Sequence, residues 1–307
     1  MKHYSVLLEE CISNLQIKEN GIYVDGTLGY AGHSSHILEN IPNGFLYAFD
    51  ADTEAIQYST EKLSKIRDNF KIFHSNFVYM KEMLEQENVT EVDGILFDLG
   101  VSSPQIDETI RGFSFMNDAP LDMRMDQTQE FSAFHVVNEY SKEDLTEMFY
   151  AYGEESKSKF IANEIVNARK EKRIETTKEL VAIIEKAVGA KYFNLKHPER
   201  QIFQAIRIEV NNELNVLEKV LPDAISLLKK GGRICVITFH SLEDRIVKRI
   251  FKKYSEVDAM FKNLPYIPEE YMPTLKLVGK SITPSNKELE ENNRARSSRL
   301  RVAEKIK

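Results

Sequence analysis

The chain has 307 residues, of which 42% are hydrophobic and 29% are charged. These values are typical of a folded globular protein and exclude a disordered chain. The formal net charge is −7 and the pI is about 5.7. This balance argues against nucleic-acid binding by the surface as a whole, but local basic patches would still permit it.

The sequence predicts a cytoplasmic protein. It has no apolar run of about 18 residues, which a membrane span requires. The apolar stretch Val6–Leu8 before Glu9 is too short for a secretory signal. Cys11 and Cys235 lie far apart without metal-ligand spacing, so we expect two reduced, packed cysteines. We expect no bound metal, no membrane contact and no obligate protein partner.

Short apolar strands alternate with helical patterns in the first third of the chain. Strands separated by helices of this length predict right-handed βαβ units and a parallel sheet covered on both faces. The fold class is therefore α/β, with a Rossmann-like sheet. The expected strands cover residues 22–24, 45–49, 70–73 and 95–97, and the first two are followed by helices at 33–38 and 55–63.

The periodicity then becomes helical. Residues 117–198 contain helix signals and no convincing strand, including helix starts at Ser141 and at Thr176 with Glu179 three residues on. Such a block inside an α/β chain predicts an inserted all-helical domain. We place the first part of the α/β domain at residues 1–112, the inserted substrate-recognition domain at 113–199 and the second part at 200–307.

The α/β pattern resumes after the insertion. Apolar residues from Ile202 to Leu221 recur every three or four positions and predict one long helix. Pro222 suits the first turn of a second helix, which we expect to end at Gly231 and Gly232. A buried strand at 234–239 and a basic helix from Leu242 follow. Residues 274–280 and 298–303 are candidates for edge strands.

A glycine-rich turn follows the first strand, from Asp25 to Gly32. Its glycines permit close approach of the backbone to a ligand, and Asp50 ends the next strand, where a carboxylate can accept both ribose hydroxyls of an adenosine. Dinucleotide enzymes share this logic, but the dinucleotide spacing Gly-x-Gly-x-x-Gly is absent. An acidic residue at the position of Asp25 suits the ammonium of a methionine moiety. A tight turn without a ligand is the alternative.

Six motifs occur in a fixed order along nearly the whole chain. Together they resemble those of the bacterial 16S ribosomal RNA cytosine-N4 methyltransferases, the ribosomal small subunit methyltransferase H family. One departure is Ala31, where that family most often has glycine. The motifs are DGTLGYAGHS from Asp25, DLGVSSPQ from Asp98, RGFSFM from Arg111, PLDMRM from Pro120, FHSLEDRIVK from Phe239 and RARSS from Arg294.

The resemblance implies an S-adenosylmethionine-dependent enzyme that methylates the exocyclic N4 amine of a cytidine in the decoding region of 16S ribosomal RNA. It implies the small ribosomal subunit as partner. Phe77 follows the third strand, where an aromatic ring can cover an adenine or simply pack in the core. The implied cofactor-binding residues are Gly32, His33, Ser34, Asp50, Phe77, Asp98 and Gln105.

Asp98 is the candidate catalytic residue. The lone pair of a cytosine amine is delocalised into the ring, and an acceptor for its N–H would direct that lone pair toward the methyl donor. Ser102 and Ser103 are weaker candidates, and Asp98 is alternatively a cofactor ligand only. Amino-methyltransferases usually continue with two prolines and an aromatic residue, which this chain lacks. The amine is reachable only in an unpaired or flipped base.

Basic residues are concentrated in three segments that are compatible with RNA phosphates. In the helix after the fifth strand they recur every three or four positions, opposite an apolar face. Arg111, Asp122 and Arg124 either line the substrate cleft or form a buried ion-pair network. The three segments contain Arg245, Lys248, Arg249, Lys252 and Lys253; Arg294, Arg296, Arg299 and Arg301; and Lys157, Lys159, Arg169, Lys170, Lys172 and Arg173.

Two other functions stay open at this point. One is a DNA methyltransferase acting on cytosine N4 or adenine N6, against which the missing Pro-Pro-aromatic sequence counts. The other is a nucleotide-binding module that assists assembly without catalysis, against which the presence of both Asp50 and Asp98 counts.

Overall fold

The structure is a computed structural model that describes residues 5–257, 260–261 and 266–307. The chain forms two compact units, Met1–Gly100 with Leu214–Lys307, and Val101–Glu213. These boundaries differ from the predicted ones at 112/113 and 199/200, because the segments just outside the predicted insertion belong to the second unit. Among the described residues, no helix is long and apolar enough to cross a membrane.

The first unit is built on a sheet whose described strands number seven, in the order β3-β2-β1-β4-β5-β7-β6. Strands β1 to β5 are parallel, and β7 runs antiparallel between β5 and β6. This confirms the predicted α/β class with a Rossmann-like sheet. The strands are β1 Ile22–Asp25, β2 Phe45–Asp50, β3 Phe70–His74, β4 Val92–Asp98, β5 Leu228–Thr238, β6 Leu275–Leu277 and β7 Arg299–Lys305.

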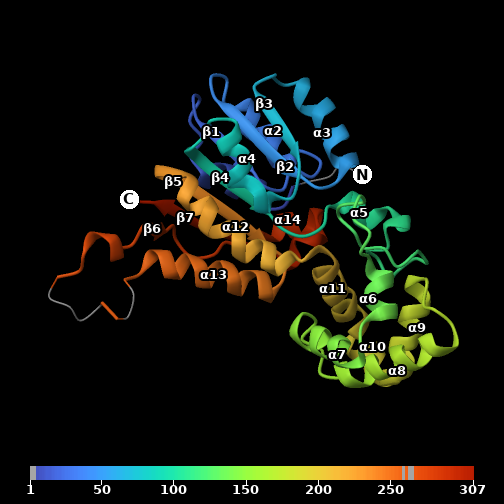
Figure 1. Cartoon of the computed structure of the whole chain (residues 1–307). Coiled ribbons are helices and arrows are strands. Elements are labelled where there is room, and N and C mark those ends of the chain that lie inside the picture. The colour runs from blue at the N-terminus through green and yellow to red at the C-terminus, as the bar shows by residue number, and fades with distance from the viewer. Residues whose placement is uncertain (1–4, 258–259, 262–265) are drawn as a thin grey trace. The chain divides into compact units, whose positions relative to one another are not determined.

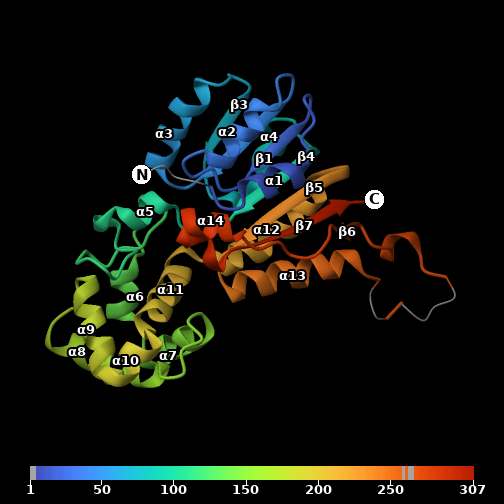
Figure 2. The same ribbon diagram turned by 180° about the vertical axis from the view of Figure 1, so that it is seen from behind.

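Helices cover both faces of this sheet, as Figures 1 and 2 show. Helices α4 (Met80–Gln86), α12 (Glu213–Leu227) and α13 (Ser241–Ser255) pack on the face that carries Val24 and Phe97. Helices α1 (Leu8–Leu15), α2 (Gly32–Glu39) and α3 (Thr53–Ser64) pack on the face that carries Tyr23 and Leu96. The alternation of Tyr23 with Val24 along β1 sends successive side chains to opposite faces. Shorter elements are η1 Phe77–Tyr79, η3 Glu269–Tyr271, α14 Asn286–Glu291 and η4 Asn293–Ser297.

The second unit is helical and has its own core. The predicted helix starts are confirmed: Ser141 Oγ accepts the N–H of Asp144 at 3.0 Å, and Thr176 with Glu179 forms a capping box. Apart from a single β-bridge between Pro120 and Thr176, the described part of this unit has no strand pairing. Its elements are α5 Ser103–Asp107, η2 Thr109–Arg111, α6 Ala133–Glu139, α7 Lys142–Ala151, α8 Ser158–Glu171, α9 Thr177–Val188, α10 Ala190–Lys196 and α11 Pro198–Asn211.

The predicted helix break at Pro222 is wrong. Helix α11 ends at Asn211, because Asn212 adopts the left-handed conformation with φ of 52°, and α12 then runs through Pro222 to Leu227. Strand β5 begins at Leu228, so Gly231 and Gly232 lie inside it and do not end a helix. Helix α11 packs in the second core through Ile202 and Ile206, which is why the unit boundary falls after it.

Both strands that were predicted as edge strands form, as β6 and β7. Of these two, only β6 lies at an edge of the described sheet. Strand β7 is flanked by β5 and β6. Cys11 and Cys235 are free and fully buried in one cluster, which confirms that they pack as small hydrophobic residues.

Candidate active site

Three aspartates end neighbouring parallel strands of the first unit. Asp50, Asp25 and Asp98 are the last residues of β2, β1 and β4, which lie side by side in the sheet. Because the carboxyl ends of parallel strands meet at one edge, the three carboxyl groups gather there, where α/β proteins bind their ligands. The structure thus brings together two of the predicted site residues, Asp50 and Asp98, around Asp25.

Asp25 holds the glycine-rich turn together. Its side chain is 1% exposed, and it accepts hydrogen bonds from Ser34 Oγ at 2.6 Å and from the Thr27 N–H at 3.0 Å. Burial raises the pKa of the Asp25 carboxyl, although these bonds oppose the shift. Since the side chain is almost fully buried and both oxygens bind groups of the turn and of the following helix, this geometry favours a structural role over contact with a methionine ammonium.

Glycine occupies two positions of the turn for different physical reasons. A Cβ on Gly26 would lie 2.4 Å from the Phe97 ring, so this residue is small because the turn crosses the core side chain of β4. Gly29 has a φ of +48° and donates its N–H to Asp50 Oδ2 at 2.7 Å. Contact with Phe97 is thus sufficient to explain Gly26, and the predicted close approach to a ligand stays a prediction. Ala31 adopts a φ of 52°, a conformation that glycine tolerates better.

Asp50 is held as a hydrogen-bond acceptor at the end of β2. Its Oδ2 accepts the Gly29 N–H at 2.7 Å, and its Oδ1 accepts the Asp52 N–H at 2.9 Å. Burial raises the pKa of Asp50 to about 6, against the opposing effect of these two bonds. Each carboxylate oxygen keeps a further lone pair, so Asp50 can accept two more donors, as the paired hydroxyls of a ribose require.

Asp98 carries the most perturbed acidic group of this edge. Its backbone N–H donates to Thr27 Oγ1 at 2.6 Å, and its Oδ2 lies 3.6 Å from His33 Nδ1. Its Oδ1 is buried and has no hydrogen-bond partner among the described residues. Burial, and then the charges of Asp25, Glu243 and Glu288, raise the pKa of Asp98 well above its usual range. A buried acceptor without a partner is costly in a structural role and points to a ligand.

His33 is buried beside Asp98 near the start of α2. Its Nε2 lies 3.1 Å from the backbone oxygen of Val6. Burial lowers the pKa of His33 to about 4, so the ring is neutral at physiological pH. A carbonyl oxygen can only accept, so Nε2 carries the hydrogen and Nδ1 presents its lone pair to Asp98.

The other predicted site residues take varied positions. Ser34 is occupied by Asp25, and Gly32 packs so closely on Ser5 that a Cβ would lie 1.7 Å from its hydroxyl oxygen. Phe77 is half-buried and meets the Phe97 ring edge-on at 5.4 Å, so one side of it belongs to the core. Gln105 lies in the second unit, where its Oε1 accepts the N–H of Ser102 at 2.9 Å within the cap of α5.

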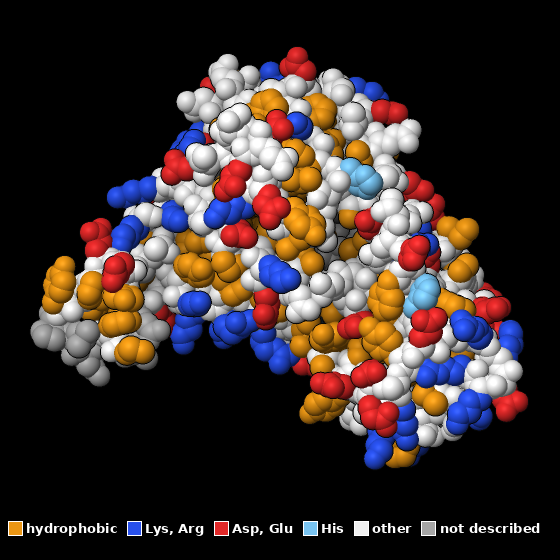
Figure 3. All heavy atoms as spheres, in the orientation of Figure 1, with side chains coloured by type: hydrophobic (Ala, Val, Ile, Leu, Met, Phe, Trp, Pro, Cys, Tyr) orange, Lys and Arg blue, Asp and Glu red, His pale blue; other side chains and the backbone are white. Residues whose placement is uncertain are grey.

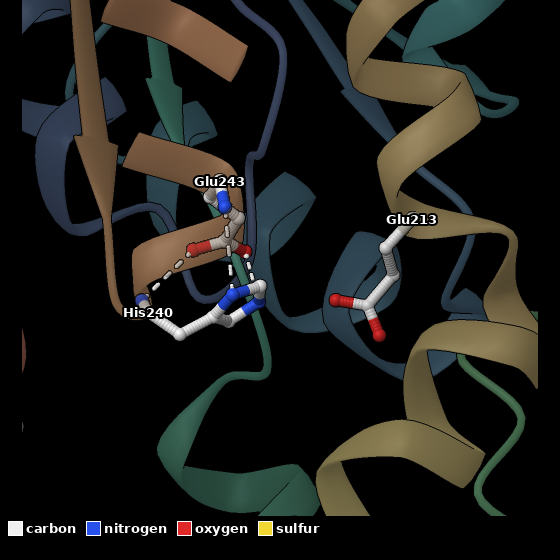
Figure 4. Close-up of side chains that lie close together, drawn as sticks. All are labelled: Glu213, His240 and Glu243. Carbon is white, nitrogen blue, oxygen red and sulfur yellow. Dashed lines mark hydrogen bonds and ion pairs between the residues drawn. The ribbon is translucent and has the colours of Figure 1, made fainter. Parts of the chain in front are cut away.

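A further residue belongs to this edge and was not among the predicted site residues. Glu243, at the start of α13, is 2% exposed and accepts the N–H of Phe239 at 2.7 Å, and it forms a capping box with His240 (Figure 4). Its charge is one of those that raise the pKa of Asp98. The cap residue is His240, whereas the usual capping-box signature has Ser or Thr there, so this signature does not mark the carboxylate in the sequence. Figure 4 also labels Glu213, the last residue of the second unit, which pairs with Arg207.

The arginines of the PLDMRM and RGFSFM motifs make structural contacts within the second unit. Arg124 forms a bidentate pair with Asp122 at 2.8 and 2.7 Å. Arg111 is 4% exposed and donates to the backbone oxygens of Arg124 and Met125. The Arg124–Asp122 pair is only partly buried and Arg111 binds mainly backbone oxygens, so these contacts do not form the predicted buried ion-pair network, and a role in the substrate cleft stays a prediction.

Comparison with known proteins identifies relatives of the whole chain. The model of a protein family described as "MraW methylase family" matches residues 1–306. A protein of Exiguobacterium sibiricum named "Ribosomal RNA small subunit methyltransferase H" is 52% identical over 308 residues, covering 100% of this chain and 99% of the relative. This similarity confirms the family predicted from the six motifs.

Solved structures give a weaker likeness. An rRNA methylase from Streptococcus thermophilus aligns over 100% of both chains with 10% identity and a TM-score of 0.45. A putative methyltransferase from Streptococcus mutans, solved in complex with SAH, covers 99% of this chain and 100% of its own, with 10% identity and a TM-score of 0.46. The family assignment does not depend on either.

Proposed function

This chain belongs to the MraW methylase family, and we propose that it transfers the methyl group of S-adenosylmethionine to the N4 amine of a cytidine in 16S ribosomal RNA, in the decoding region of the small subunit. The observation that carries this proposal is the 52% identity over the full length of a named ribosomal RNA small subunit methyltransferase. The six motifs in register support the specific base and amine.

The carboxyl edge of the sheet fits the proposed cofactor. Asp50 offers two anionic oxygens to a ribose, and Asp98 offers a buried oxygen that has no partner among the described residues. We assign cofactor binding to the predicted set, in which Phe77 packs on Phe97 and is only partly buried. When bound, S-adenosylmethionine supplies an electrophilic methyl group on a positively charged sulfur. The set is Gly32, His33, Ser34, Asp50, Phe77, Asp98 and Gln105.

Asp98 is the proposed acceptor for the amine of the target cytidine. Its free Oδ1 can accept a hydrogen bond from the amine N–H, which keeps the nitrogen lone pair available for the incoming methyl group. As a carboxylate, Asp98 then takes the proton that the methylated nitrogen loses. Proton removal by a positioned group contributes about 10² to 10⁴ in rate.

His33 is a positioning residue for this acceptor. Its Nδ1 lone pair faces Oδ2 of Asp98 at 3.6 Å and offers that oxygen no hydrogen, which makes the Asp98 carboxylate a stronger base for the amine proton. The contact is too long for a hydrogen bond as it stands, and catalytic contacts commonly shorten when substrate binds. His33→Asn should therefore shift the pH dependence of kcat, whereas a merely structural residue would change only stability.

Two measurements test the proposed function. S-adenosylmethionine should raise the melting temperature of the protein, and NADH should leave it unchanged. With a labelled methyl group, transfer should reach small ribosomal subunits from a strain that lacks the enzyme and should not reach duplex DNA. Labelling of DNA alone would replace the proposal with a DNA methyltransferase, and cofactor binding without any labelling would favour the assembly module.

A further inference from the structure

A hollow on the first unit lies between the second half of α13 and the edge of the sheet. Its walls come from α13, from β6 and β7, and from the Gly279–Ser281 segment between these strands. That segment is held to β7 at both ends, since the Val278 N–H donates to Val302 O at 3.0 Å and the Ile282 N–H donates to Leu300 O at 2.9 Å. The hollow has a volume of about 260 Å³, slightly below the range of about 300–1,000 Å³ for sites that enclose a whole small molecule, so it would hold only part of a larger ligand.

The rim of the hollow is basic. Lys248, Lys252 and Lys280 line it, and none of them has an ion-pair or hydrogen-bond partner among the described residues. Arg301 also lines it, but Asp244 binds its guanidinium bidentately at 2.7 and 2.9 Å. The uncompensated charge of the rim therefore comes from the three lysines, with Glu256 as the opposing carboxylate.

Other basic residues of α13 are already engaged. Arg249 pairs with Glu218, and the Lys253 ammonium lies 5.9 Å from the Tyr254 ring. The predicted basic face of this helix is real, as Figure 3 shows by the Lys and Arg side chains along the surface where α13 lies in Figure 1. The lysines that remain available on it, Lys248 and Lys252, are those that turn toward the hollow.

The floor of the hollow is apolar. Phe251 and Val302 line it but are only 2% and 5% exposed, so Leu277, which is 47% exposed, offers the most apolar surface of the three. An apolar floor under a basic rim fits a nucleotide, whose base has apolar faces and whose phosphate is an anion. A free inorganic anion would be held by the rim alone and would leave the floor unused.

The hollow lies close to the active-site edge of the same unit. Val302 pairs with Cys235, three residues before the end of β5 at Thr238, which is about 10 Å along the strand. Helix α13 itself starts at that edge with the cap formed by His240 and Glu243. A strand of RNA with its target base at the carboxyl edge can therefore reach the hollow with a nearby nucleotide.

We propose that this hollow is a docking site for a nucleotide that flanks the target cytidine in single-stranded RNA, with Lys248, Lys252 and Lys280 binding its phosphates. The proposal rests on the proposed function, because it takes the substrate to be RNA. The site gives a physical account of how a chain with a net charge of −7 holds a polyanion: the needed positive charge is local.

The test measures binding of a fluorescently labelled single-stranded RNA of about 12 nucleotides at a series of salt concentrations. A plot of log K against log salt has a negative slope. Each lost phosphate contact should reduce the magnitude of this slope by about 0.7 for a single strand. Replacing the three lysines by glutamine should therefore lower it by about 2. When salt is raised from 50 to 200 mM, the glutamine variant should lose affinity by a factor about 20-fold smaller than the factor lost by the wild type.

Three controls separate the outcomes. Replacing the same lysines by arginine should keep the slope, since the charge is kept. Lys65→Gln with Arg67→Gln removes two exposed charges at the end of α3, near the far edge of the sheet, and should also keep it. S-adenosylmethionine should bind the glutamine variant as it binds the wild type, which shows that the variant is folded.

The two proposals fail in different ways. If the glutamine variant has the slope of the wild type while both methylate small ribosomal subunits, the hollow is not an RNA site and the proposed function stands. If the wild type neither binds the RNA nor methylates subunits, the proposed function itself fails. Support requires the reduced slope together with a raised KM for subunits and an unchanged kcat.

Discussion

The raised pKa of Asp50 predicts how cofactor affinity depends on pH. The ribose hydroxyls need a carboxylate that accepts on both oxygens, and burial raises the pKa of this group to about 6. At pH 5 only about a tenth of the protein has the competent form, so the Kd for S-adenosylmethionine should rise about tenfold between pH 7.5 and pH 5. The folding stability of the cofactor-free protein depends on pH with the opposite sign. Because the pKa of Asp50 is higher in the folded state, this group stabilises the fold fully below the unfolded pKa of about 4, and this contribution is lost as pH rises through 6.

Asp50→Asn isolates this carboxylate. The variant keeps one oxygen of the two that accept backbone N–H groups, and it loses the charge-assisted bonds, which are worth about 1.5–3 kcal/mol. Its Kd at pH 7.5 should rise about 10- to 150-fold and should no longer change between pH 5 and pH 7.5. Calorimetric titration measures both effects, with Asp68→Asn, an exposed aspartate, as the control. A wild-type Kd that is constant over this range, or a variant that keeps the pH dependence, would refute the assignment of Asp50.

Three further substitutions probe the same edge of the sheet. Asp98→Asn should lower kcat by about 10² to 10⁴ in single-turnover assays; an unchanged kcat with a raised Kd for cofactor would make Asp98 a cofactor ligand only. Gly26→Ala should destabilise the protein by about 1–3 kcal/mol in urea unfolding, because its Cβ meets Phe97 at 2.4 Å, and an unaffected midpoint would contradict that packing. Ser34→Ala leaves Asp25 short of a donor and should cost about 1–3 kcal/mol by the same method, whereas a neutral result would show that water replaces the hydroxyl.

The sheet could be predicted because each of its strands carries its own local signal. Buried runs such as Phe45–Phe49 end at an acidic residue, and the helices between them enforce parallel pairing. Ser141 and Thr176 marked their helices correctly, since a cap depends only on residues three positions apart. These features need no knowledge of distant contacts.

The break before α12 could not be predicted in this way. Pro222 is a strong stop signal by itself, yet packing of Val220 and Leu221 in the first core keeps the helix continuous through it. The actual break at Asn212 depends on a left-handed backbone that asparagine tolerates and that leaves little trace in the hydrophobic pattern.

The sequence could place the acidic residues of the candidate site at one edge of the sheet, but not the contacts around them. The positions of Asp50 and Asp98 follow from the ends of their strands. The role of Gly26 depends on Phe97, and the tautomer of His33 depends on a backbone oxygen of Val6. Both are contacts between segments that are remote in sequence, and no spacing rule reveals them.

The central claim is tested most directly by identifying the methylated nucleoside. Small ribosomal subunits from a strain that lacks the enzyme are incubated with the protein and S-adenosylmethionine, and the digested 16S RNA is analysed by mass spectrometry. We expect N4-methylcytidine at one position of the decoding region, formed by the wild type and nearly absent with Asp98→Asn. A methyl group on another base, on a ring carbon or on ribose would contradict it.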